Sequence, residues 1–264
     1  MAGPTTAERG DRQQESSGPP LVRRLRRLRL RVIIIFAIAL VLLGAGTAWL
    51  LYGSPWLRVD RVSVSGTRVL TPAEVRAAAA VPVGKPLVSV DTEAIAARLR
   101  QKLPRIDTVE VERSWPHGIA LKVTERTPVL LIAKNGAFVE VDRQGVRFAT
   151  VSQRPKAVAM LQLSLSKPGS SAASLRRFGE DRLVREAVAV ARRLPPAVAR
   201  VTRTVKVRSY DDISLALTGG RTVSWGSGEK GRAKARTLTA LMKAAPDARH
   251  FDVSVPTAPA SSGS

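Results

Sequence analysis

The most pronounced hydrophobic pattern in the chain is an unbroken apolar run from Val32 to Tyr52. No charged residue occurs between Arg31 and Arg58. A helix rises about 1.5 Å per residue, so this run is long enough to cross the roughly 30 Å hydrocarbon core of a bilayer. The pattern predicts a transmembrane helix over residues 32–52.

Positive charge is concentrated on one side of this run, and it predicts the orientation of the helix. The residues just before the run include Arg23, Arg24, Arg26, Arg27, Arg29 and Arg31. Basic residues stay on the cytoplasmic side of a span. We therefore expect residues 1–31 to form a disordered, basic cytoplasmic tail, and everything after Tyr52 to lie outside the cell membrane.

A cleavable signal peptide is the alternative reading of the same run. Signal peptides have a shorter apolar region, about 7–15 residues, that ends in small residues. This run is longer and ends in Trp-Leu-Leu-Tyr. The pattern favours an uncleaved anchor, which makes the lipid bilayer an expected partner.

Beyond the span, residues 57–126 show strand and helix patterns in the order β-α-α-β-β. Thr71 and Glu74 form a capping box with proline at the first helical position, which predicts a helix over residues 73–80. Asp91 is expected to cap a second helix, and a turn at residues 114–118 separates two alternating strands. The expected core consists of Val62, Val64, Ile95, Leu99, Val109, Val111, Leu121 and Val123.

A second block, residues 127–256, is expected to form a separate domain rich in β-strands. Asn135-Gly136 between two apolar runs is a strong signal for a two-residue hairpin. Helices are expected over residues 181–194 and 230–244, among strands marked by alternating apolar positions. Residues 257–264 are expected to be a disordered tail.

The last predicted strand is the candidate partner-binding site. Alternation over Phe251, Asp252, Val253, Ser254 and Val255 directs three apolar side chains to one face and two polar ones to the other. The strand follows the last helix, so we expect it to end the sheet with one edge exposed. An extended peptide can pair with the backbone of such an edge.

Composition narrows the class of protein. The chain has no cysteine, which excludes disulfides and zinc–thiolate sites. Its net charge is +22, from 43 basic and 21 acidic residues, and most of it falls outside the membrane, where nucleic acid is not an expected partner. Anionic headgroups or wall polymers suit such a surface, although a general richness in arginine is the simpler explanation.

Two enzyme-like motifs lack the context that their chemistry needs. Residues 226–231 match G-x-G-x-x-G, but too little chain follows to complete a doubly wound sheet, which favours a plain strand-to-helix turn. Residues 164–167 match S-x-x-K without the accompanying S-D-N and K-T-G triplets. His117 and His250 stand alone in sequence. We therefore expect no catalytic residue, no cofactor and no metal site.

Trp115-Pro116 in the predicted hairpin turn allows two interpretations. The pair could be a recognition knob for a partner. The more ordinary interpretation is an aromatic side chain that closes the hairpin over its own core.

The block that follows the membrane anchor resembles a POTRA module. Its amino-acid sequence resembles that of the FtsQ/DivIB family of bacterial cell-division proteins. The resemblance is carried by residues 106–116, which include Arg113, Trp115 and Pro116, and by residues 123–129, which include Glu125, Arg126 and Pro128. Residues 219–226 and 251–253 are similar to late segments of the family's second domain.

The resemblance implies an α+β fold class and a function. A single N-terminal transmembrane helix is followed by a β-α-α-β-β POTRA domain and a second α+β domain built on an extended, mostly antiparallel sheet. The implied function is that of a non-enzymatic bitopic scaffold at the division septum. Its implied partners are FtsB/DivIC-like and FtsL-like bitopic proteins and, indirectly, the septal synthases FtsW and FtsI.

Two other classes of function remain open from the residues alone. A POTRA-bearing export or assembly factor would need a membrane β-barrel, and the second block carries helices instead of repeated lipid-facing strands. A wall-active enzyme would need a nucleophile–base pair or a carboxylate pair, which we do not find in the sequence pattern.

Overall fold

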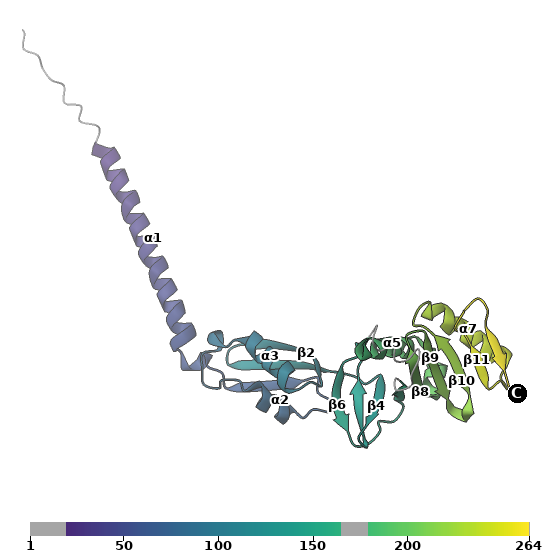
Figure 1. The fold of residues 1–264 in the computed structure, drawn as a ribbon. Helices are drawn as coiled ribbons and strands as arrows, with labels where there is room; N and C mark the ends of the chain where they lie inside the picture. The colour runs from purple at the N-terminus through teal and green to yellow at the C-terminus, as the bar shows by residue number, and fades with distance from the viewer. Residues whose placement is uncertain (1–19, 165–178, 264) are drawn as a thin grey trace, which may run out of the picture. The chain divides into compact units, whose positions relative to one another are not determined.

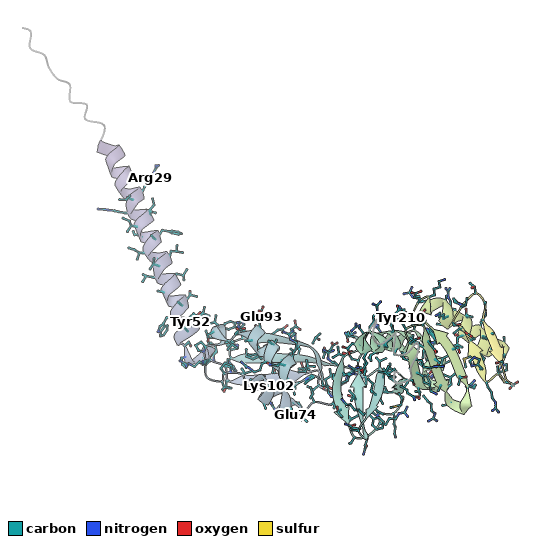
Figure 2. The ribbon with its side chains drawn as sticks, in the orientation of Figure 1. Arg29, Tyr52, Glu74, Glu93, Lys102 and Tyr210 are labelled. Carbon is teal, nitrogen blue, oxygen red and sulfur yellow. The ribbon has the colours of Figure 1, made fainter. Side chains whose placement is uncertain are left out.

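The computed structural model describes residues 20–164 and 179–263, with side chains from Arg29 onward. Its first element is helix α1, Pro20–Gly53 (Figure 1). Residues Arg29–Gly53 of this helix are long and apolar enough to cross a membrane, judged by length and composition. Arg29 and Tyr52, labelled in Figure 2, lie near the two ends of this stretch.

The helix begins earlier than the disordered tail predicted for residues 1–31 allows. Residues 20–31 are helical, so the prediction of disorder is wrong there, and residues 1–19 lie outside the described part of the chain. The reason is local: Leu and Arg, which make up most of this segment, are good helix formers. The segment therefore continues the membrane helix toward the N-terminus.

Contacts within the chain divide it into two compact units. One unit joins α1 and the residues that follow it, up to Arg61, to residues 82–90 and 114–118. The other contains residues 62–81, 91–113 and 119 onward. These units do not test the domain boundaries expected from the sequence at residues 57, 126 and 256, which stay predictions.

The predicted β-α-α-β-β order is present. A three-stranded sheet has the strand order β1-β3-β2, with the longest connection, between β1 and β2, carrying the helices. The elements are β1 (Arg61–Ser65), α2 (Pro72–Ala79), the 3-10 turn η2 (Leu87–Ser89), α3 (Thr92–Lys102), β2 (Ile106–Ser114) and β3 (Gly118–Glu125).

Both helices begin at the caps that the sequence predicts. The Thr71 hydroxyl accepts a hydrogen bond from the Glu74 backbone N–H, and the Glu74 carboxylate accepts one from the Thr71 N–H at 2.8 Å, which completes the capping box. The hydrogen bond from the Thr71 N–H is the main cause that lowers the pKa of Glu74, and the Thr71 hydroxyl, which donates to the same carboxylate at 2.8 Å, lowers it further. The Asp91 carboxylate accepts from the Ala94 N–H at 2.9 Å and caps α3.

The predicted core of this block is half right. Ile95, Leu99, Leu121 and Val123 are fully buried, and the equivalent side chains on the outer strands are only half-buried: Val62, Val64, Val109 and Val111. The difference follows from strand order, because β3 has a neighbour on both sides whereas β1 and β2 are edges. The remaining buried positions lie outside the predicted core, in turns, in helices and on two strands: Val59, Val75, Ala78, Ala79, Leu87, Val90, Ile106 and Ile119.

The second block forms a nine-stranded sheet with the order β12-β11-β10-β9-β8-β7-β4-β5-β6. Three of the strand pairs are parallel and five are antiparallel, so the sheet is mostly antiparallel, as expected. The strands are β4 (Leu130–Lys134), β5 (Ala137–Val141), β6 (Arg147–Val151), β7 (Ala159–Leu163), β8 (Thr202–Ser209), β9 (Asp212–Leu217), β10 (Thr222–Gly226), β11 (His250–Asp252) and β12 (Ala260–Ser262). The helices are α5 (Glu180–Arg193), α6 (Pro196–Val201) and α7 (Gly231–Ala244).

The hairpin predicted at Asn135-Gly136 connects β4 to β5. Both residues have positive φ, 51° and 78°, as a two-residue hairpin turn of the favoured twist requires. Lys134 pairs with Ala137 across this turn, and the register continues to Leu130 and Val141.

Alternation places one face of the large sheet in the core. In β9 every second residue is buried, at Ile213, Leu215 and Leu217, and β8 and β10 alternate in the same way. Helix α5 lies against β8, and α7 lies against β11 and α5. The apolar face of α5 that closes this core consists of Leu183, Val184, Ala187, Val188 and Val190. Trp225, which is fully buried, is the largest side chain in it.

Candidate partner-binding edge

Strand β11 is shorter than predicted and does not provide a free edge. It contains His250–Asp252, runs parallel to β10, and pairs on its other side with the antiparallel strand β12. The prediction of an exposed edge over residues 251–255 is therefore wrong. It failed because part of the C-terminal tail, expected to be disordered, folds back as β12 and covers that edge.

Backbone hydrogen bonds show which groups of β11 face which neighbour. The carbonyl of Arg249 accepts from the Thr222 N–H at 2.8 Å, and the Val253 N–H donates to the Ser224 carbonyl at 2.9 Å, so both face β10. Successive residues of a strand direct their backbone groups to opposite sides. His250 and Asp252 therefore direct theirs to β12.

At this end of the sheet the outermost strand is β12, and β6 is the outermost strand at the other end. The register of β12 pairs Ser262 with His250 and Ala260 with Asp252, so the backbone groups of these two residues face β11. Ser261 lies between them, and its N–H and C=O consequently point away from the sheet. All three residues of β12 are exposed, and among the described residues no strand pairs with its outer side.

The side chains of residues 251–255 divide as alternation predicts, except at the end. Phe251 and Val253 are fully buried in the core. Val255 is 54% exposed, because regular pairing stops at Asp252 and the chain turns away. The Asp252 carboxylate accepts from the hydroxyl and the N–H of Ser254, at 2.7 and 2.9 Å. The hydroxyl hydrogen bond is the main cause that lowers the pKa of Asp252.

The glycine-rich stretch after β10 is the strand-to-helix turn that the sequence favours. Gly226 ends the strand with a φ of +74°, and α7 begins at Gly231. The ammonium of Lys234, on the first turns of α7, donates to the carbonyls of Trp225 and Ser227 at 2.8 and 2.9 Å. Lys234 is buried, and burial lowers its pKa.

Lys234 belongs to the family-like late segment, and its burial is a feature that our sequence reasoning did not predict. It lies four positions before Leu238, on the apolar face of α7, and this spacing is the signal that could have indicated its burial. Its two carbonyl acceptors explain how a lysine is accommodated in this core.

Glu125 of the family-like segment holds a loop of the small sheet's domain. It ends β3, and its carboxylate accepts hydrogen bonds from three consecutive backbone N–H groups, those of Arg68, Val69 and Leu70, at 2.7 to 3.1 Å. A carboxylate that accepts several backbone hydrogen bonds is strongly held. Glu125 therefore fixes the segment that leads from β1 to α2.

Arg126, the next residue, joins residues of the two sheets. Its guanidinium donates to the Pro104 carbonyl at 3.1 Å, lies 3.5 Å from a carboxylate oxygen of Asp107 and forms an ion pair with Asp142. The Asp142 side chain is only 1% exposed. A second ion pair runs in parallel, from Arg105 to the buried Glu140 at 2.6 Å.

The other family-like residues lie apart from these ion pairs. Arg113 lies near the end of β2, and Trp115, in the turn that follows, is 52% exposed and precedes a cis peptide bond to Pro116. Trp115 does not close the hairpin over its own core, so the more ordinary interpretation of this residue is wrong. Pro128 is half-buried ahead of β4.

The remaining candidate residues form no site together. His250 contacts the Thr222 hydroxyl through Nδ1 at 2.9 Å, and the His117 carbonyl accepts from the Asp60 and Arg61 N–H groups. Within residues 20–164 and 179–263, no group of three His, Cys, Asp or Glu side chains could hold a metal ion. The S-x-x-K match lies outside the described residues, apart from Ser164.

Comparison with known proteins decides the family. The family description "POTRA domain, FtsQ-type" matches residues 57–126. The chain is 75% identical over its full length to "Cell division protein FtsQ" of Streptomyces collinus, and 76% identical to that of Streptomyces coelicolor, and covers all of both proteins. The chain belongs to the FtsQ family of cell division proteins.

More distant relatives and one solved structure extend the comparison. Cell division protein FtsQ of Mycolicibacterium smegmatis is 33% identical over 227 residues, which span 86% of this chain and 64% of that protein. The major extracytoplasmic domain of DivIB from Geobacillus stearothermophilus is similar at a TM-score of 0.30 and 15% identity, over 51% of this chain and 97% of that one. Membership in the FtsQ family confirms the resemblance drawn from the sequence and assigns a role in cell division.

Proposed function

We propose that this chain is a non-enzymatic bitopic scaffold that links bacterial division proteins to septal peptidoglycan synthesis. Helix α1 anchors it in the cell membrane with the N-terminus in the cytoplasm and both sheets outside. The apolar run of α1 and the arginines that precede it support this orientation. The FtsQ family supports a place at the division septum.

We assign a different role to each of the two sheets. Residues 57–126 form the POTRA domain, and residues 127–256 form the domain that recruits partners. The proposed direct partners are FtsB/DivIC-like and FtsL-like bitopic proteins, and FtsW and FtsI are reached indirectly. No nucleic acid, cofactor or metal ion takes part in this proposal.

The observation that carries the proposal is the outward-facing backbone of Ser261 on β12. A partner segment can add a strand there by pairing with the N–H and C=O of this residue. The small side chains of Ala260 and Ser262 allow close approach. Because β12 is only three residues long, the partner must also make side-chain contacts to bind tightly.

The test compares Ser261→Pro with Ser261→Ala in the full-length, membrane-embedded chain. Proline removes the outward N–H and leaves the Ala260 and Ser262 pairs with β11 in place. Alanine keeps the backbone donor. We expect S261P to lose capture of the co-expressed FtsB/DivIC-like protein and S261A to retain it, with circular dichroism unchanged in both.

Full capture by a well-folded S261P variant would contradict the edge-strand proposal. Topology is tested separately with a reporter that works only in the cytoplasm. It should be active when fused ahead of Arg23 and silent when fused after Ser264. An active C-terminal fusion would contradict the bitopic orientation and would leave the edge-strand proposal for β12 unaffected.

A further inference from the structure

Three segments that are far apart in the sequence are tied together beside the end of the membrane helix. The Val59 N–H donates to the Lys85 carbonyl at 2.9 Å, and the Gly84 N–H donates back to the Val59 carbonyl at 2.8 Å. The Asp60 N–H donates to the His117 carbonyl at 2.9 Å. These bonds bring residues 55–61, 82–90 and 114–118 into the same compact unit as the end of α1.

Each of these three segments has a large apolar side chain that is exposed to solvent. Trp56 is 72% exposed, Val83 is 64% exposed and Trp115 is 52% exposed. The same segments bury Val59, Leu87 and Val90 almost completely, so their exposed apolar residues are not the result of a missing core. On the last turns of α1, Trp49 and Tyr52 are exposed as well.

The charges around these side chains are mostly positive. Arg58, Arg61 and Lys85 are exposed on the same segments, and Asp60 is the acidic residue among them. Among the described residues, none of the three basic side chains forms an ion pair with a carboxylate. The Arg58 guanidinium donates to the Gly84 carbonyl at 3.0 Å, which holds this positive charge beside Val83.

We propose that Trp56, Val83 and Trp115, with Arg58, Arg61 and Lys85, form a lipid-contacting surface that inserts among the anionic headgroups of the outer leaflet. The inference rests on the proposed membrane anchoring by α1. Tryptophan rings favour the headgroup layer, where their apolar part and their N–H are both accommodated, and basic side chains there bind lipid phosphate. The surface gives the extracytoplasmic part a second attachment to the bilayer beyond the helix itself.

A membrane explains this combination better than a protein partner does. Helix α1 contacts the η2 turn, and all three segments belong to the same compact unit as the end of the apolar span at Gly53. Apolar side chains set among basic ones suit a lipid interface, where burial of apolar area adds to the attraction between basic side chains and anionic lipid. It also gives Trp115-Pro116 a role that the internal packing of the hairpin does not provide.

The absence of cysteine makes a direct test available, because one introduced cysteine is the only labelling site. The full-length chain carrying Val83→Cys is labelled with a nitroxide and reconstituted alone into vesicles that contain phosphatidylglycerol. Accessibility to oxygen, which concentrates in the bilayer, is compared with accessibility to a water-soluble nickel chelate. Matched labels are placed at Thr124→Cys, an exposed position of β3 in the other unit, and at Leu42→Cys in the span.

We expect the Val83 label to favour oxygen over the nickel chelate and the Thr124 label to show the reverse. Trp115→Ala should shift the Val83 label toward the values at Thr124. Vesicles of phosphatidylcholine alone should weaken the oxygen preference at Val83, because the basic side chains then lack anionic headgroups.

The remaining outcomes separate this inference from the proposed function. If the Leu42 label lies in the bilayer while the Val83 label is as open to nickel as the Thr124 label, the lipid-contacting surface is overturned and the anchor stands. That result is also the one expected if these residues serve a protein partner instead. If the Leu42 label is itself open to nickel, the membrane anchoring fails and the lipid-contacting surface fails with it.

Discussion

The two ends of strand β3 carry two family-like segments that behave in opposite ways. Trp115-Pro116 precedes the strand and presents an indole that is half exposed. Glu125 and Arg126 end the strand, and internal partners occupy both of their side chains. Residues that identify a family therefore need not share a role. Those with internal partners stabilise the fold, whereas an exposed aromatic is available for contacts with something else.

The ion pairs near Arg126 also show why this end of β3 is the structural one. Asp142 and Glu140 are buried carboxylates, and a buried charge is tolerated only when it is paired and hydrogen-bonded. Asp142 additionally accepts from the N–H groups of Gln144 and Val146 at 2.8 Å. The loss of either arginine would leave one of these carboxylates without its counterion.

Among the substitutions at the two ends of β3, Arg126→Met should destabilise the fold most. We expect the free energy of unfolding to fall by about 3–5 kcal/mol, because Asp142 is left as an uncompensated buried charge. Urea unfolding of the full chain in detergent measures it. Arg143→Met is the matched control: its side chain is 61% exposed and pairs with Asp107 at 3.0 Å, and removal of such a pair costs about 0–1 kcal/mol. Equal losses in both variants would contradict the structural role of Arg126.

Leu99→Ala provides the reference value for the loss of stability that a substitution in the buried core causes. Leu99 is fully buried on α3, so we expect a loss of about 2–5 kcal/mol from lost burial and the cavity left behind. Arg100→Ala, one residue further and exposed, should change stability by about 0.5 kcal/mol or less. An unchanged unfolding midpoint for Leu99→Ala would mean that the buried face of α3 has been assigned incorrectly.

Glu125→Ala should lower the free energy of unfolding by less than Arg126→Met does. The variant removes the acceptor of three backbone hydrogen bonds, and hydrogen bonds to a charged group are each worth about 1.5–3 kcal/mol. These donors are largely exposed and can bind water instead, so we expect a total of about 1.5–3 kcal/mol. Hydrogen exchange at the amides of Arg68 to Leu70 should accelerate locally. Exchange that stays as slow as in the unchanged chain would show that Glu125 does not hold this loop.

The middle of the hairpin provides a pH-dependent effect that is smaller again. The Lys122 ammonium donates to Glu112 at 2.9 Å, and this hydrogen bond lowers the pKa of Glu112 and raises that of Lys122. A lowered carboxyl pKa stabilises the fold above the ordinary value of about 4.3 and ceases to do so as the pH falls through the folded-state pKa. Glu112→Gln should therefore unfold earlier than the unchanged chain at pH 7, and the difference should disappear as the pH falls through the folded-state pKa of Glu112. A difference that persists at acid pH would assign the effect to something other than this charge.

Trp115→Ala should have the smallest effect on stability. The side chain is half exposed, so we expect a change of about 0.5 kcal/mol or less, the usual range for surface substitutions. Thermal unfolding followed by circular dichroism measures it. A loss as large as that of Leu99→Ala would remove the contrast between the two ends of β3 and return Trp115 to the core of the hairpin.

Local signals in the sequence were sufficient for most of the fold. The apolar run, the capping box at Thr71, the Asp91 cap and the Asn135-Gly136 turn each act over a few neighbouring residues, and the structure contains all four. Alternation likewise predicted that Phe251 and Val253 face the core. Such features depend on neighbours in the chain, so the sequence alone determines them.

Tertiary structure decided which strand ends the sheet and which charges are buried. Strand β12 consists of Ala, Ser and Ser, which have little intrinsic preference for a strand, and it forms because β11 offers an unpaired backbone. The partners of Arg126 and Glu125 come from residues up to 57 positions away in the chain, and the turn that contains Trp115 belongs to the same compact unit as residues 82–90. Long-range pairing of this kind depends on how the elements pack, and no local pattern encodes it.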